Sequence, residues 1–214
     1  MSIDKLDWHY DSAEELYRKD NGIKEDLSEE LIEEVEMLAG NHIGMFIRWL
    51  IDSDLFNEDY VDEETIEKVK SGSLSPTKLL IEKLDSKLID SEIKENARAF
   101  VMEYYDKDYF NDYDSKCLKD FEVYSVISTE EDYQQLKKII DFTYSHYLKT
   151  GKYMNYSRIV NKKNLMIMFI CCFIGTVIFF SIAIGLGMNS EMVFLFSVFG
   201  LTLGLFMTDR FKKK

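Results

Sequence analysis

The sequence predicts a mainly α protein in which a compact helical cytoplasmic domain precedes a two-helix transmembrane hairpin. Three observations support this fold class: an acidic N-terminal region with helix-capping motifs, two long apolar segments near the C-terminus, and basic residues that flank those segments. The 214 residues therefore divide into four parts. These parts are an acidic helical domain (1–150), a basic juxtamembrane linker (151–164), the transmembrane hairpin (165–208) and a basic cytoplasmic tail (209–214).

Both apolar segments are long enough for membrane-spanning helices. Residues 165–186 contain no charged side chain and as a helix would cover about 33 Å, the thickness of a typical hydrocarbon core. Residues 192–208 are shorter, at the low end of the usual range. Because only five residues separate the two segments, we expect antiparallel spans. Gly200 and Gly204 form a GxxxG pair, which predicts close approach of another helix, either the first span or a second copy.

The basic residues predict the orientation of the hairpin in the cell membrane. Lys and Arg occur on the linker side and in the tail, whereas the turn at 187–191 has none. By the positive-inside rule both termini are then cytoplasmic. The basic linker would bind anionic lipid headgroups, while the acidic domain would be repelled from them. The flanking basic residues are Lys149, Lys152, Arg158, Lys162, Lys163, Arg210, Lys212, Lys213 and Lys214.

The acidic domain shows capping motifs and apolar spacings of three and four residues, which predict helices. Asp26 and Glu29 match a capping box, and an apolar stripe predicts one helix from there to about Ile51. Gly44 within it indicates close approach of another element, since glycine in a helix costs about 1 kcal/mol. Phe121 to Ile127 alternates weakly and predicts a short extended segment. The stripe comprises Leu31, Val35, Leu38, His42, Met45 and Trp49. Further helices are predicted at 63–71, ended by Gly72; at 76–84, after Ser75; at 91–105; and at 129–148, with Ser128 and Glu131 as capping box.

The distribution of charge along the chain indicates which class of partner the acidic domain can bind. Residues 162–214 hold six of the 26 Lys and Arg and two of the 39 Asp and Glu, which leaves 20 basic and 37 acidic residues upstream, a net charge of −17. Nucleic acid is therefore excluded as an expected ligand, because its phosphates require a basic surface. A protein partner with a basic surface fits better, although an acidic surface is also a common solubility device. The candidate partner-binding residues are Glu29, Glu30, Glu33 and Glu34.

The sequence contains no recognisable catalytic motif, so we expect no enzyme activity, no cofactor and no metal site. Three cysteines, at 117, 171 and 172, lack the spacing of metal ligands or a disulfide framework. His42 lies on the apolar stripe and is expected to be a hydrogen-bonded core histidine, while His146 is expected to pack near a helix end. The aspartates at 106, 108, 112 and 114 lack the glycine and closing glutamate of a calcium loop.

Several short motifs together resemble an uncharacterised bacterial family of acidic helical domains, over about residues 5 to 147. Members of that family are often encoded among secreted polymorphic toxins and their antidotes, so the resemblance implies a binding protein, most plausibly an immunity protein. Glu122 and Asp132 depart from the proline and tryptophan usual in that family, and the hairpin is an addition to it. The motifs are Trp8-His9-Tyr10, Asn41-His42-Ile43-Gly44-Met45-Phe46 with Trp49, Ser71-Gly72, Ala99-Phe100, Tyr104-Tyr105, 109–113, and Val123-Tyr124-Ser125-Val126 before Tyr133.

The same aromatic residues have a purely structural interpretation, because large rings dominate the cores of small domains. On that interpretation Trp8, Tyr10, Phe46, Trp49, Phe100, Tyr104 and Tyr124 form the core. Two functions remain. The first is a membrane-anchored immunity protein that neutralises a toxin at the inner face of the membrane. The second is a membrane-anchored scaffold or regulatory module with an unrelated cytoplasmic partner; either could form homo-oligomers.

Overall fold

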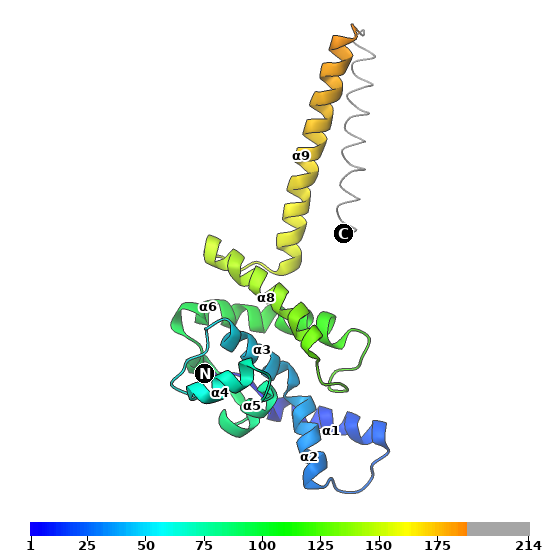
Figure 1. The fold of residues 1–214 in the computed structure, drawn as a ribbon. Helices are drawn as coiled ribbons and strands as arrows, with labels where there is room; N and C mark the ends of the chain where they lie inside the picture. Colours follow the sequence, from blue (N-terminus) through cyan, green and yellow to red (C-terminus); the bar gives the residue numbers. More distant parts are fainter. Residues whose placement is uncertain (188–214) are drawn as a thin grey trace. The chain divides into compact units, whose positions relative to one another are not determined.

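A computed structural model describes residues 1–187 and confirms a mainly helical protein (Figure 1). The chain divides into two compact units, Met1–Tyr153 and a second unit that begins at Met154. The α-helices of the first unit are α1 (Asp7–Asn21), α2 (Glu29–Ala39), α3 (Asn41–Asp52), α4 (Glu63–Lys70), α5 (Pro76–Lys83), α6 (Glu95–Tyr104), α7 (Phe110–Tyr113) and α8 (Glu130–Thr150). The other elements are strands β1 (Ser2–Lys5) and β2 (Lys87–Ile89), a 3-10 turn η1 (Asp90–Glu92), and two π-helical segments, η2 (Tyr105–Tyr109) and η3 (Asp114–Leu118).

Helix α3 forms the centre of the first unit. Its residues are buried on every face, as expected for a helix enclosed by others. Phe46 and Trp49 pack with Phe100 and Tyr104 of α6, and all four side chains are fully buried. The indole N–H of Trp49 donates to Asp141 of α8 at 2.8 Å, which satisfies the one polar atom of that ring. These four predicted core aromatics are confirmed.

The prediction of one helix from residue 26 to 51 is wrong. The chain forms two helices, α2 and α3, because Gly40 ends the first, with its N–H bonded to the carbonyl of Glu36. The N-cap of α2 is Ser28, whose hydroxyl accepts from the N–H of Leu31, so Asp26 is not the cap. The helix cap, Ser28, thus lies two residues after Asp26, where the capping-box match begins.

Helices α4 and α5 confirm the predicted positions within one residue at either end. Helix α5 packs against α3 where Gly44 faces Thr77. A Cβ atom added at Gly44 would lie 2.8 Å from the backbone nitrogen of Thr77 and 2.9 Å from its Cα. The prediction that Gly44 marks a close approach is therefore confirmed: only glycine fits between the two backbones.

Several elements differ from the predicted ones. Strand β1 pairs antiparallel with β2, and α1 follows it; the sequence predicted neither. Residues 121–127 form turns and coil rather than an extended segment. Helix α8 is capped by Thr129 with Asp132 as its reciprocal partner, one residue after the predicted pair. Trp8 is 60 % exposed, so its predicted core position is wrong, and Tyr10 and Tyr124 are only partly buried.

The second unit contains α9 (Tyr156–Gly185) within the described residues. Among residues 1–187 it is the one helix whose length and apolar composition suit a membrane span, over Tyr156–Ile182. As a helix those 27 residues cover about 40 Å. The predicted second span, 192–208, with Gly200 and Gly204, and the tail at 209–214 lie outside the described residues.

Candidate functional site

The four predicted partner-binding glutamates all lie on α2 with exposed side chains. Glu29 and Glu30 occupy the first turn, where negative charge is favoured by the helix dipole. Glu33 and Glu34 lie one turn further on and lack that benefit. Each is four residues from a like charge, an arrangement that costs a helix a few tenths of a kcal/mol. The local structure therefore explains the first two glutamates but not the second two.

Glu30, Glu33 and Glu34 border a surface hollow of about 540 Å³, and a smaller hollow of about 170 Å³ adjoins it. Both hollows are lined by Glu33, Met37 and Lys78, so they form one depression between α2 and α5, here named the acidic trough. Apolar side chains contribute to its lining and glutamates surround them. The lining residues are Glu30, Glu33, Glu34, Glu36, Met37, Leu38, Lys78, Ile81, Glu82 and Ile127. Glu29 does not line it.

The acidic trough carries an excess of negative charge, with five glutamates and one lysine among its lining residues. Partial burial, together with the neighbouring charges of Glu33 and Asp7, raises the pKa of Glu36. Glu34 accepts a hydrogen bond from the hydroxyl of Tyr17 on α1, which fixes its direction. The trough thus combines crowded carboxylates with exposed apolar surface such as Ile127, which is 46 % exposed.

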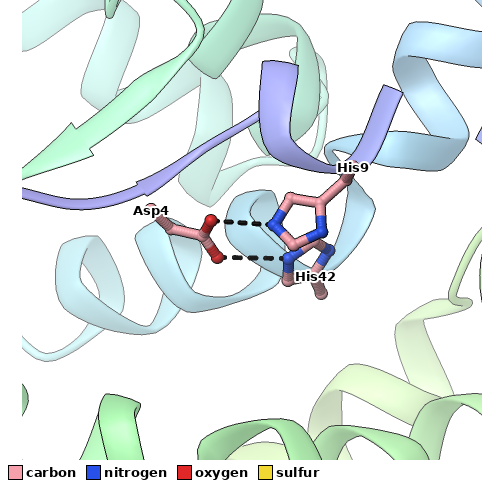
Figure 2. A group of neighbouring side chains, drawn as sticks. All are labelled: Asp4, His9 and His42. Atoms are coloured by element: carbon pink, nitrogen blue, oxygen red, sulfur yellow. Dashed lines mark hydrogen bonds and ion pairs between the residues drawn. The ribbon is translucent and has the colours of Figure 1, made fainter. Parts of the chain in front are cut away.

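A second cluster brings together three residues that are far apart in the sequence: Asp4 of β1, His9 of α1 and His42 of α3. Figure 2 shows the Asp4 carboxylate facing both imidazole rings, with one oxygen directed at each. Its Oδ1 lies 2.8 Å from Nε2 of His9, and its Oδ2 lies 3.2 Å from Nε2 of His42. The two rings meet edge to face with centroids 4.4 Å apart. Asp4 and His42 are buried, while the side chain of His9 is 20 % exposed.

The outer atoms of this Asp4–His9–His42 cluster are held by further hydrogen bonds. The hydroxyl of Tyr105 donates to Oδ2 of Asp4 at 2.7 Å. The hydroxyl of Tyr124 lies 2.7 Å from Nδ1 of His9. Hydrogen bonding to the backbone of Ala39 acts to raise the pKa of His42, against the effect of burial. Each of the three side chains is therefore held in position by hydrogen bonding to a residue outside the cluster.

Unusual backbone conformations position two of these tyrosines. Tyr105 begins the π-helical segment η2, which also carries Tyr109, whose hydroxyl donates to the backbone carbonyl of His42. Tyr124 adopts a φ of +67°, which is strained for an aromatic residue. Short π-helical segments and strained non-glycine residues both concentrate at functional sites. Here both occur at the residues that contact the cluster.

Burial and hydrogen bonding shift the pKa values of the cluster in defined directions. Burial raises the pKa of Asp4, but hydrogen bonds and charge from His42 and His9 outweigh it, so the pKa lies well below its usual range. Burial lowers the pKa of His42, and the bond to Asp4 compensates only in part. Burial also raises the pKa of Tyr105 well above its usual value, with a contribution from Asp4. Tyr105 is therefore a neutral donor to an ionised carboxylate.

His42 is a buried, hydrogen-bonded histidine, which confirms the prediction from its place on the apolar stripe. The sequence pattern indicates no role for Asp4 and no chemistry for His9. No spacing along the chain indicates the cluster, since its members lie on three elements. His146 lies on α8, away from the cluster, near the hydroxyl of Thr150. The aspartates at 106–114 lie on η2, α7 and η3, so they do not form a calcium-binding loop.

The model of a family described as a domain of unknown function (DUF7832) matches residues 2–127, more than half of the chain. The chain belongs to the DUF7832 family. No curated protein and no solved structure matches it.

The DUF7832 match contains both sites described above. It covers every member of the Asp4–His9–His42 cluster and every lining residue of the acidic trough. Helix α8 lies beyond the match, yet Tyr133, Leu136 and Ile140 of α8 belong to the main hydrophobic core. In this chain the folded unit therefore extends past the matched segment to Tyr153.

Proposed function

We propose that this chain is a membrane-anchored immunity protein whose acidic trough binds a toxin with a basic surface. The observation that carries the proposal is the trough itself, where glutamates surround apolar side chains between α2 and α5. The identification of the partner as a toxin rests on the sequence resemblance described above. The like charges of Glu30, Glu33 and Glu34 on successive helical turns cost the helix stability, and a cationic partner would offset that cost.

The chemistry of the trough specifies its occupant as a basic segment that also presents apolar side chains. Lys and Arg of that segment would pair with the glutamates, while its apolar face would cover Met37, Leu38 and Ile127. Complementary charge of this kind speeds association and makes it weaken with salt. Neutralising crowded carboxylates would also remove their mutual repulsion, which adds to burial in raising the pKa of Glu36.

The membrane anchor in this proposal is α9 together with a second span at 192–208. Helix α9 has the length and composition of a span, and the distribution of Lys and Arg favours cytoplasmic termini. Gly200 and Gly204 would then pack the second span against α9 or against another copy. Anchoring would raise the local concentration of the trough where a membrane-active toxin inserts.

The proposal is tested by capturing the partner of the detergent-solubilised full-length chain from its host and repeating the capture with trough variants. We expect a cationic partner whose binding is lost in the double variant Glu30→Lys, Glu33→Lys. The matched control is Asp11→Lys, Glu15→Lys, which changes the net charge equally on exposed positions of α1. Equal loss of binding in both double variants would mean that net charge, not the trough, attracts the partner.

The role of the anchor is tested by co-expressing the captured toxin with three forms of the protein. These are the full chain, a fragment ending at Tyr153, and that fragment fused to an unrelated transmembrane helix. Protection of growth by both anchored forms and weak protection by the free fragment would support local capture. Equal protection by the free fragment would refute a role for the anchor.

The proposed topology has a separate test in intact cells. Single cysteines are introduced at residues 189 and 214, in a background without Cys117, Cys171 and Cys172, and labelled with an impermeant thiol reagent. We expect labelling at 189 and none at 214. The reverse pattern would contradict cytoplasmic termini.

A further inference from the structure

We propose that Asp4, His9 and His42 bind a divalent transition-metal ion of the zinc type. This inference is independent of the proposed function, since none of the three residues lines the acidic trough. Two imidazole nitrogens and a carboxylate oxygen form a ligand set that Zn²⁺ prefers. Ca²⁺ and Mg²⁺ prefer oxygen ligands alone and fit the cluster less well.

The distances within the cluster suit such an ion. The three ligand atoms all lie within 4.8 Å of one another. Zinc bonds of about 2.0–2.1 Å in tetrahedral geometry place neighbouring ligand atoms about 3.3 Å apart. The separations of 2.8 Å from Oδ1 of Asp4 to His9 and 3.2 Å from Oδ2 to His42 are each within about 0.5 Å of that value. The two imidazole nitrogens, at up to 4.8 Å, would have to approach each other by up to about 1.5 Å when the ion binds.

The hydrogen-bonding of His42 gives a chemical reason for a cation at this position. Nε2 of His42 faces the Asp4 carboxylate at 3.2 Å, and both side chains are buried. An ion at this position would be bound by an imidazole nitrogen and a carboxylate oxygen away from bulk water.

Residues around the cluster hydrogen-bond to the side chains that would bind the ion and so orient them. Ligating histidines almost always donate their other N–H to a carbonyl, hydroxyl or carboxylate group, which fixes the tautomer. The hydroxyl of Tyr124 has this role for His9, since it lies 2.7 Å from Nδ1. Tyr105 orients the carboxylate of Asp4. The strained backbone at Tyr124 and the π-helical turn at Tyr105 then both serve to direct a tyrosine hydroxyl at a side chain that binds the ion.

The partial exposure of His9 leaves a route by which an ion can enter and a water molecule can take the fourth position. A bound ion would cross-link β1, α1 and α3, because each of these elements supplies one ligand. Binding would therefore stabilise the N-terminal part of the domain against unfolding. Its effect is measurable without any knowledge of the partner protein.

The test uses the full chain in detergent, purified through a tag that contains no histidine and stripped with a chelator. Cys171 and Cys172 are replaced by serine, because thiolates also bind zinc. Co²⁺ and Zn²⁺ are titrated separately, with the visible absorption of Co²⁺ and the melting temperature as readouts. We expect one ion per chain, a tetrahedral Co²⁺ spectrum, and a rise in melting temperature of about 5 °C at saturating Zn²⁺.

Variants decide whether the ion occupies the cluster. His9→Gln, at the partly exposed position, should lower affinity at least about tenfold, as should Asp4→Asn. Tyr124→Phe should lower it about tenfold, because it removes the hydroxyl that contacts Nδ1 of His9. His146→Gln is the matched histidine control and should bind like the parent. Absence of the tetrahedral spectrum in the parent, or equal affinity in His9→Gln and His146→Gln, would refute the metal site and leave a proton-shared hydrogen-bond network.

Discussion

Replacing Gly44 by alanine should destabilise the domain by about 2 kcal/mol, because α3 and α5 approach each other too closely for a side chain at that position. The new Cβ would lie 2.8 Å from the backbone nitrogen of Thr77, whereas ordinary contacts begin at 3.4 Å, so the helices must separate by about 0.6 Å. Overpacking of this kind costs about 1–3 kcal/mol. Backbone atoms cannot rotate away from the new Cβ, so the loss of stability from overpacking lies at the upper end of that range, about 3 kcal/mol. The higher helix propensity of alanine offsets about 1 kcal/mol of this loss.

Gly40→Ala is the matched control for this prediction. Its added Cβ would meet only side-chain methyl groups of Thr77, Leu6 and Leu80, at 3.1–3.2 Å, and these can move by a few tenths of an ångström. We expect its free energy of unfolding to stay within about 1 kcal/mol of the parent. Urea unfolding of the fragment 1–153, followed by the fluorescence of buried Trp49, measures both. The reasoning is refuted if Gly44→Ala is no less stable than Gly40→Ala.

Three further predictions concern the same fragment. Glu92 is buried, which raises its pKa to about 7, so the folded state holds its proton more tightly than the unfolded state and stability falls as pH rises from about 4.5 to above 7. Glu92→Gln should remove about 1–3 kcal/mol of that decline between pH 5 and pH 8; an unchanged pH slope in urea unfolding would contradict this. Burial raises the pKa of the Cys117 thiol to about 12, so it should resist a thiol reagent at pH 8 until urea unfolds the fragment, and rapid labelling of the native state would show that the thiol is accessible. The fragment itself should be soluble and helical by circular dichroism, since its core clusters lie entirely within residues 1–153; aggregation would place the domain boundary elsewhere.

Features that depend on neighbouring residues were predictable from the sequence. The starts of α4 and α5 follow from local signals, a capping aspartate at 62 and Pro76 in the first turn. Gly44 indicated a close approach because its cost in a helix needs a compensating reason. The acidic face of α2 followed from the spacing of its glutamates. Such signals act within one or two turns, where helical geometry is fixed.

Features that depend on tertiary contacts were not predictable. Gly40, where α2 ends and α3 begins, packs against Thr77, Leu80 and Leu6, which lie far from it in the sequence. Strand β1 is only four residues long and is stabilised by pairing with β2, more than 80 positions later. The Asp4–His9–His42 cluster depends on that pairing and on the position of α1. No local pattern contains this information.

The central claim of this account is that the acidic trough binds a basic partner, and a salt-dependent affinity measurement tests it most directly. Calorimetric titration of the captured partner into the full chain, at low and at physiological salt, would be compared with Glu30→Lys, Glu33→Lys and with the control Asp11→Lys, Glu15→Lys. We predict that the trough variant loses at least about tenfold in affinity, equivalent to about 1.4 kcal/mol, and most of its salt dependence, while the control retains both. Equal affinity of the trough variant and the parent at both salt concentrations would contradict the account.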